Sequence, residues 1–409
     1  MSRCARIAAV AGLAALVPLP VLACAPAPAP APAPTPAPTP VARPPAPLPA
    51  VPARCPQPAS SSFGLGVEAA ARFWRVVSLD QGYGALDALA VSGDGAVWAT
   101  HSTQRRTGTT VETRFDGLRR WAGGRWEPFA VPGLTVTALG AVSGERAWVF
   151  GAAGGAPGFV GTYGDGTVTT QWLSPGTGTP PGTGTAPGTG TSVGLAGTAA
   201  RGPWAVSGAE AWRWEEAGWR AYRLPVKAGA VGGEGANVWT VGGAHSAQGP
   251  AARWNGSAWQ AVGVPELGFP RGATSPRAHL DDVAVLGPRD VWAVGGVSWL
   301  VPDEYDAQGE PLERLRPVAL HWDGGTWTCA WGPVGSTFTQ AEPDGGGGLW
   351  VLDSTGTRLL HHSAGRWTST EIPGTVAALS HRPGTREVYA AGSTPHGEDL
   401  TRATLWRTG

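Results

Sequence analysis

Trp254-Asn255-Gly256-Ser257-Ala258-Trp259 decides the fold of this chain, because two large rings flank a dipeptide that closes tight turns. Asn-Gly adopts positive φ at low cost and therefore joins two antiparallel strands with their native twist. The same spacing recurs in the pairs Trp121 and Trp126, Trp214 and Trp219, Trp322 and Trp327, and His362 and Trp367. Rings that face each other across a hairpin bury a large apolar area. A hairpin repeated at long intervals predicts a repeat architecture.

A second motif precedes each hairpin and ends in an aromatic residue on an apolar strand, as in residues 283–292. It occurs seven times, with its aromatic residue at Trp98, Trp148, Trp204, Trp239, Trp292, Trp350 and Tyr389. The spacings of 50, 56, 35, 53, 58 and 39 residues scatter around the length of a propeller blade. We therefore predict an all-β fold, a seven-bladed β-propeller with four-stranded antiparallel blades. Its innermost strands are rich in Ala and Gly, which suits a crowded central axis.

The two ends of the repeat region complement each other. The last copy stops inside a hairpin at residues 405–409 and lacks its outermost strand, whereas residues 73–77 have the pattern of that strand. Joining the two ends places Trp406 five positions before Trp74, the spacing of the other hairpins. We predict that the N-terminal strand closes the last blade and thereby removes an open sheet edge.

These repeats resemble those of bacterial extracytoplasmic β-propellers, which combine Trp-Ala-Val-Gly strands with Trp-Asp/Asn-Gly turns. The copies at residues 94–98 and 344–350 also resemble repeats of the sensor propellers of two-component regulators, in the kelch-like class. The resemblance covers residues 73–409 and implies a propeller fold. It implies no particular activity, because one fold hosts many functions.

The N-terminus has the pattern of an export signal, residues 1–23. Arg3 and Arg6 precede an apolar stretch that is too short to span a bilayer. Residues 21–24 resemble a bacterial lipobox, which implies that Cys24 becomes a lipidated N-terminus; cleavage before Cys24 without lipidation is the alternative. The resemblance implies an outer-membrane or cell-surface lipoprotein in a Gram-negative host, touching the membrane through this lipid only. Without the lipid, the protein is periplasmic or secreted.

Residues 24–58 are rich in Ala and Pro, a composition that favours an extended, disordered stalk over a packed core. Residues 59–72 form a lead-in to the propeller at residues 73–409. Cys4 leaves with the signal, so Cys55 and Cys329 remain in a compartment where disulfides persist. The two residues form either a bridge that ties the stalk to the body or a pair of unrelated thiols.

Binding is expected at long segments between strands, because variable loops on a rigid scaffold usually carry function. In a propeller these segments lie on one face, and we expect most of the decoration over blades 4 and 5. The segments are residues 101–113, 173–192, 243–251, 263–280, 296–317, 330–337 and 393–402.

The segment 296–317 is the richest in side chains that bind ligands. Its candidate site consists of Trp299, Asp303, Glu304, Tyr305 and Asp306. Acidic groups beside aromatic rings suit a cation, a sugar or a basic partner. The alternative is a solvated segment that tucks Trp299 onto the domain.

Three classes of function remain open. The leading prediction is a non-enzymatic binding or scaffold protein whose partner is an unknown protein or glycan. The alternatives are an extracytoplasmic hydrolase or lyase with a site at the mouth of the central channel, and an architectural envelope protein. An enzyme needs polar groups that converge at the ends of the innermost strands, and these strands are mostly Ala, Gly and Val. His279 near Asp281 and Asp282 forms either a His–carboxylate pair near the decorated face or part of a solvated blade edge. We expect no catalytic residue, cofactor or metal, no nucleic-acid partner at a net charge of +0, and a monomer.

Overall fold

The computed structural model describes residues 54–63, 66–67, 73–129, 131, 134–153, 156–164, 167–172, 194–196, 203–215, 218–244 and 251–409. All regular structure in these residues is β-strand, and they contain no helix long and apolar enough to cross a membrane. They belong to one compact unit, Leu48–Gly409. The predicted signal peptide, Cys24, most of the stalk and the segment 173–192 lie outside the described residues.

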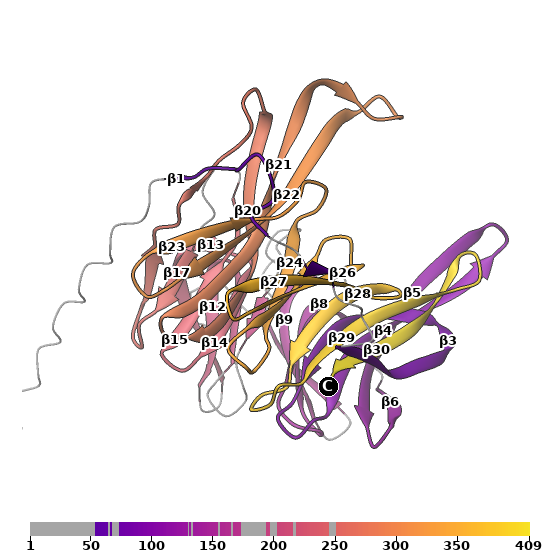
Figure 1. Ribbon diagram of the computed structural model, residues 1–409. Helices are drawn as coiled ribbons and strands as arrows, with labels where there is room; N and C mark the ends of the chain where they lie inside the picture. The colour runs from indigo at the N-terminus through magenta and orange to yellow at the C-terminus, as the bar shows by residue number, and fades with distance from the viewer. Residues whose placement is uncertain are drawn as a thin grey trace, which may run out of the picture. The chain divides into compact units, whose positions relative to one another are not determined.

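The strands form antiparallel sheets that follow one another along the chain (Figure 1). Blade 1 contains the second half of β3 (Trp74–Val91), β4 (Val97–Thr107), β5 (Thr110–Ala122) and β6 (Arg125–Phe129). Blade 2 contains β7 (Leu134–Ala141), β8 (Ala147–Ala153), β9 (Ala156–Gly164) and β10 (Thr167–Trp172). Blade 3 contains β11 (Gly194–Ala196), β12 (Trp204–Glu215) and β13 (Gly218–Ala228). A register shift after Gly208 divides β12 into a half that pairs with β11 and a half that pairs with β13.

The remaining blades continue this pattern. Blade 4 contains β14 (Ala230–Glu234), β15 (Asn237–Val241), β17 (Ala251–Trp254) and β18 (Trp259–Val262). Blade 5 contains β20 (Thr274–Gly287), β21 (Asp290–Tyr305), β22 (Pro311–Trp322) and β23 (Trp327–Trp331), with β16 (Gly243–Ala244) added beside β20. Blade 6 contains β24 (Phe338–Pro343), β25 (Leu349–Asp353), β26 (Arg358–Ser363) and β27 (Arg366–Glu371). Blade 7 contains β28 (Thr375–His381), β29 (Val388–His396), β30 (Leu400–Thr408) and the first half of β3.

The innermost strands contact one another in a closed cycle. β3 contacts β7, and the contacts continue through β11, β14, β20, β24 and β28 back to β3. The fold is therefore a β-propeller, as predicted, and the cycle accounts for seven blades.

The ring closes through the N-terminal strand, which confirms that prediction. β3 pairs with β30 through its first half and with β4 through its second half. The register differs from the expected one: Val76, not Trp74, lies opposite Trp406, and Trp74 lies opposite Thr408. Because no turn connects these two strands, the spacing of a hairpin does not fix their register.

The tryptophans of the hairpins and of the second strands interlock between blades. Within the predicted hairpins the two rings lie directly opposite each other, as with Trp254 and Trp259. The second-strand Trp204 of blade 3 then packs against both of these blade 4 rings, with centroids 4.9 and 5.1 Å apart. Trp239 meets the hairpin rings of blade 5 in the same way. The two sequence motifs are thus the two halves of one contact between blades.

Small residues line the inner strands because neighbouring backbones approach closely there. A Cβ placed on Gly232 of β14 would lie 2.0 Å from the carbonyl oxygen of Val283 on β20. We expect Gly232→Ala to lower the free energy of unfolding by about 1–3 kcal/mol, because the two blades must move apart. Gly287→Ala, where a Cβ meets nothing within 4 Å, should change it by less than about 0.5 kcal/mol. Equal midpoints for the two variants in urea denaturation would refute this explanation.

Several segments that we predicted as irregular loops are extended hairpins instead. Strands β4 and β5 pair up to Thr107 and Thr110, β29 and β30 up to His396 and Leu400, and β21 and β22 up to Tyr305. These extensions belong to blades 1, 7 and 5; for blade 4, residues 245–250 of the predicted segment lie outside the described residues. The strand propensity of Thr- and Val-containing segments continues beyond the blade, which loop length alone did not reveal.

Residues 54–58, at the end of the predicted stalk, are docked on the propeller. β1 (Arg54–Cys55) pairs in parallel with β19 (Glu266–Leu267), and β2 (Gly66–Val67) pairs in parallel with β27. A disulfide joins Cys55 to Cys329 on β23, with the Cα atoms 6.1 Å apart. We call the described residues 54–63 and 66–67 the N-terminal strap.

Candidate functional site

The hairpin formed by β21 and β22 is the most exposed part of blade 5 (Figure 1). Residues 302–311 are all solvent-exposed. The tip is closed by Asp306, whose carboxylate accepts hydrogen bonds of 2.9 Å from the N–H groups of Gln308 and Glu310. An isolated two-stranded ribbon is marginally stable in water, so this hairpin depends on the blade at its base.

Of the five predicted site residues, two serve the fold and three lie exposed near the tip of the hairpin. Trp299 is 7% exposed and belongs to the core of blades 4 and 5, as the alternative interpretation expected. Asp306 holds the turn. Glu304 pairs with Arg314 at 3.1 Å, Asp303 has a φ of 60°, and Tyr305 is 63% exposed. The structure therefore leaves Asp303, Glu304 and Tyr305 together at the tip and removes Trp299 from the candidate site.

The hairpin has a strongly acidic composition. Residues 300–315 contain Asp303, Glu304, Asp306, Glu310 and Glu313 but only one basic residue, Arg314. The described residues contain no group of three or more His, Cys, Asp or Glu side chains placed to hold a metal ion. The surface thus offers negative charge and one exposed ring without a preformed metal site.

The extended hairpins of blades 1 and 7 support each other. Arg106 of β4 and Asp399, next to β30, form an ion pair of 3.2 Å, and the backbone N–H of Thr401 donates to the side-chain carbonyl of Gln104 at 3.0 Å. Tyr83 of β3 lies 5.6 Å from the ring of His396. The two hairpins thus form a second projection, which these contacts brace, whereas the blade 5 hairpin stands alone among the residues that the structure describes.

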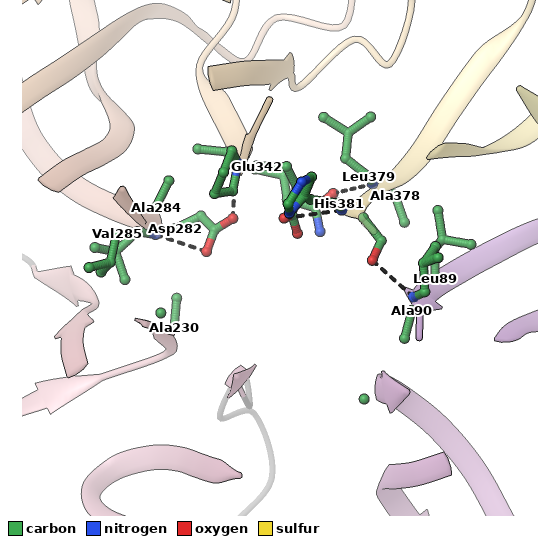
Figure 2. Close-up of a pocket in the computed structure, with 18 of the residues that line it drawn as sticks. Leu89, Ala90, Ala230, Asp282, Ala284, Val285, Glu342, Ala378, Leu379 and His381 are labelled. Atoms are coloured by element: carbon green, nitrogen blue, oxygen red, sulfur yellow. Dashed lines mark hydrogen bonds between the residues drawn. The ribbon is translucent and has the colours of Figure 1, made fainter. Parts of the chain in front are cut away.

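The innermost strands also surround a channel with a volume of about 790 Å³ (Figure 2). Its described lining comes mainly from β3, β7, β14, β20, β24 and β28, with a few residues from adjoining turns, and most of it is Ala, Gly, Val and Leu. Three side chains in this lining link neighbouring inner strands by accepting hydrogen bonds from backbone N–H groups. Asp282 accepts from the N–H of Ala341 at 2.8 Å, Gln340 from Leu379 at 2.7 Å, and Ser380 from Val91 at 3.1 Å.

Carboxyl groups gather in the channel without a Lys or Arg among its described lining residues. Burial raises the pKa of Glu342 to about 8, and the charge of Asp282 acts in the same direction. Burial raises the pKa of Asp282 to about 6, although the hydrogen bonds that it accepts from the N–H groups of Ala341 and Val283 lower this pKa. Burial also raises the pKa of Asp281 to about 7. Burial likewise raises the pKa of Asp87, on β3. The channel therefore holds protonatable acids near neutral pH.

These raised values predict that the protein loses stability as pH rises. A carboxyl group whose folded pKa is raised stabilises the fold fully below about pH 4.5, and this contribution is lost as pH rises through about 8 for Glu342. We expect Glu342→Gln to leave the thermal midpoint unchanged at pH 4 and to raise it by about 2 °C or more at pH 9. The Gln carbonyl keeps the acceptor for the N–H of His381.

Exposed Glu371→Gln is the matched control and should shift the midpoint at neither pH. A Glu342→Gln variant with the wild-type pH dependence would show that Glu342 ionises normally in the channel.

The carboxyl groups that gather in this channel were not predicted from the sequence. Its inner strands contain mostly small residues, which we took as a sign that polar groups do not converge. Asp282 and Glu342 were visible in the sequence, but they come from different blades, and only the register of the inner strands places both on the wall. His279 does pair with Asp281, at 3.2 Å, while burial lowers its pKa.

The protein is a β-propeller, as its strand pairing, its cycle of inner strands and its N-terminal closure show. It carries an acidic hairpin on blade 5 and carboxyl groups in its channel. No protein-family model matches the chain, and no curated protein matches it in sequence.

Several solved structures are similar to the chain at low sequence identity. A catalytically inactive variant of virginiamycin B lyase from Staphylococcus aureus, with quinupristin, is 12% identical at a TM-score of 0.45, covering 81% of this chain and 98% of the lyase. YCF48 from Cyanidioschyzon merolae is 13% identical at a TM-score of 0.42, covering 82% and 98%. A family 93 α-L-arabinofuranosidase of Fusarium graminearum, with arabinobiose, is 11% identical at a TM-score of 0.39, covering 80% and 94%.

Proposed function

We propose that this chain is a non-enzymatic binding or scaffold protein that engages a protein or glycan through the blade 5 hairpin. The observation that carries this proposal is the run of exposed residues at 302–311, held out by β21 and β22. The acidic side chains and the exposed ring of Tyr305 offer hydrogen-bond acceptors and an apolar contact in one place. The rigid blade beneath limits the entropy lost on binding.

We further propose that the protein is exported, with residues 1–23 as signal peptide, Cys24 as lipid anchor and the Ala/Pro-rich residues that follow as a stalk. The disulfide between Cys55 and Cys329 supports an oxidising compartment, where such bonds persist. A stalk would hold the hairpin away from the membrane surface. Metabolic labelling with a lipid precursor should mark the wild type and leave a Cys24→Ala variant unlabelled.

The binding proposal is tested by affinity capture from envelope extract with the full chain. One variant replaces residues 302–311 by Asn-Gly, which closes the shortened hairpin with a tight turn. We expect this variant to lose partners that the wild type retains. The control variant is Arg125→Ala, which changes an exposed side chain at the turn between β5 and β6 of blade 1. This control should keep the partners of the wild type. Identical partner sets for the wild type and the shortened variant would contradict the proposal and favour a purely architectural role.

A hydrolase or lyase is a second candidate, favoured by the carboxyl groups in the channel. Glu342, with its pKa near 8, suits a general acid, and Asp282, with its pKa near 6, suits a base. A panel of chromogenic glycosides and esters tests this candidate. Turnover that Glu342→Gln abolishes and Ser380→Ala leaves intact would support it, whereas no turnover by the wild type would count against it.

A further inference from the structure

The N-terminal strap crosses blades 5 and 6 in the order of the ring, and the strand that follows it closes blade 7. Cys55 is bonded to β23 of blade 5, Gly66 and Val67 pair with β27 of blade 6, and the chain then enters β3, which closes blade 7. The strand that closes the ring is therefore also the strand directly connected to the N-terminal segment. Any pull or fraying from the N-terminus reaches β3 only through the strap.

Arg316 clamps the middle of the strap to blade 5. The guanidinium donates to the carbonyl oxygens of Pro58 at 2.8 Å, Ser60 at 2.9 Å and Gly332 at 2.9 Å. It also donates to the side-chain carbonyl of Gln57 at 3.2 Å. Arg316 is 5% exposed, and burial lowers its pKa. Because every one of these acceptors is an uncharged oxygen, the buried charge depends on the strap for its solvation.

The strap also fills an aromatic pocket between blades 5 and 6. Phe63 is 5% exposed, and its ring centroid lies 4.6 Å from that of Trp367 and 5.9 Å from that of Phe338. The N–H of Ser62 donates to the carbonyl of Trp331 at 2.8 Å, which extends the hydrogen bonding of the outer strand β23. Release of the strap would expose these rings and strip Arg316 of three of its acceptors.

We propose that the Cys55–Cys329 bridge is a redox-sensitive latch that isolates the ring closure from the N-terminal segment. With the bridge closed, a load on residues before Cys55 passes covalently to β23 and bypasses the strap, β2 and β3. A dithiol opens the latch: its two thiols become a disulfide, the protein sulfur–sulfur bond breaks, and Cys55 and Cys329 take up the two protons as thiols. The strap then peels from blade 5 and blade 6, and finally the first half of β3 separates from blade 7.

Hydrogen–deuterium exchange of the full chain tests this latch in the wild type before and after reduction with dithiothreitol, and in Cys55→Ser/Cys329→Ser. We expect exchange at residues 54–63 and at residues 74–80 to accelerate at least tenfold when the bridge is absent. Strands β14 and β15 of blade 4 should exchange at unchanged rates. Faster exchange in the strap alone, in none of these segments, or equally in blade 4 would each overturn the proposal.

Arg316→Met separates the clamp from the bridge, because its disulfide remains. We expect this variant to lose protection at residues 57–62 while residues 74–80 remain as protected as in the wild type. Loss of protection in residues 74–80 with the bridge intact would show that the disulfide does not isolate the closure.

Discussion

Trp406→Ala is expected to lower the free energy of unfolding by about 3–5 kcal/mol, the range for truncation of a buried Trp. Trp406 is 2% exposed and lies on β30, between β29 and the closing strand β3. It shares a core cluster with Trp74 and Trp350, so its loss opens a cavity where blades 6 and 7 meet. Equilibrium denaturation in urea, followed by tryptophan fluorescence, measures the change.

Val76→Ala is the matched control for Trp406→Ala. Val76 lies directly opposite Trp406 in the strand register but is 55% exposed, so we expect a change below about 0.5 kcal/mol. Similar losses of stability in the two variants, or a loss below about 1 kcal/mol for Trp406→Ala, would show that Trp406 does not hold the ring closure together.

Cys55→Ser/Cys329→Ser is expected to lose about 2–5 kcal/mol relative to the oxidised wild type. The bridge joins residues separated by 274 positions, and closing so long a loop removes much entropy from the unfolded chain. Cys55 is also 1% exposed and packs in the core of blades 4 and 5, so the serines place hydroxyl groups in an apolar environment.

Reduced wild type separates these two contributions. It should lose most of the stability lost by the double serine variant, because it lacks the bridge but keeps the sulfur atoms. A reduced protein as stable as the oxidised one, measured by denaturation in urea, would show that the bridge does not stabilise the fold.

The fold was predictable because each blade repeats the same local signals. Tight turns and tryptophan spacing gave the hairpins, and the incomplete last copy indicated closure by residues 73–77. The register of that closure was not predictable, since Trp74 and Trp406 are joined by no turn. The bridge that ties Cys55 to the body was one of two alternatives from the sequence, but the other contacts of the strap were not predictable, since partners such as Arg316 lie more than 250 positions away.

The candidate site was predictable only in part. An exposed acidic segment at 296–317 followed from composition, but side-chain burial decides that Trp299 is core and that Asp306 serves the turn. Glu342 and Asp282 gave no sequence signal of convergence because they belong to different blades. Burial in the channel raises both pKa values, and the charge of Asp282 further raises that of Glu342; both effects require the folded arrangement of the blades.

Site-specific photo-crosslinking tests the proposed binding surface most directly. A benzophenone amino acid replaces Tyr305 at the hairpin tip in one variant, and in the control it replaces Arg125, whose side chain is 77% exposed at the other end of blade 1. Irradiation of the full chain in its native envelope should give a discrete crosslinked product from position 305 and none from position 125. No product from position 305, or the same products from both positions, would contradict a binding function for the blade 5 hairpin.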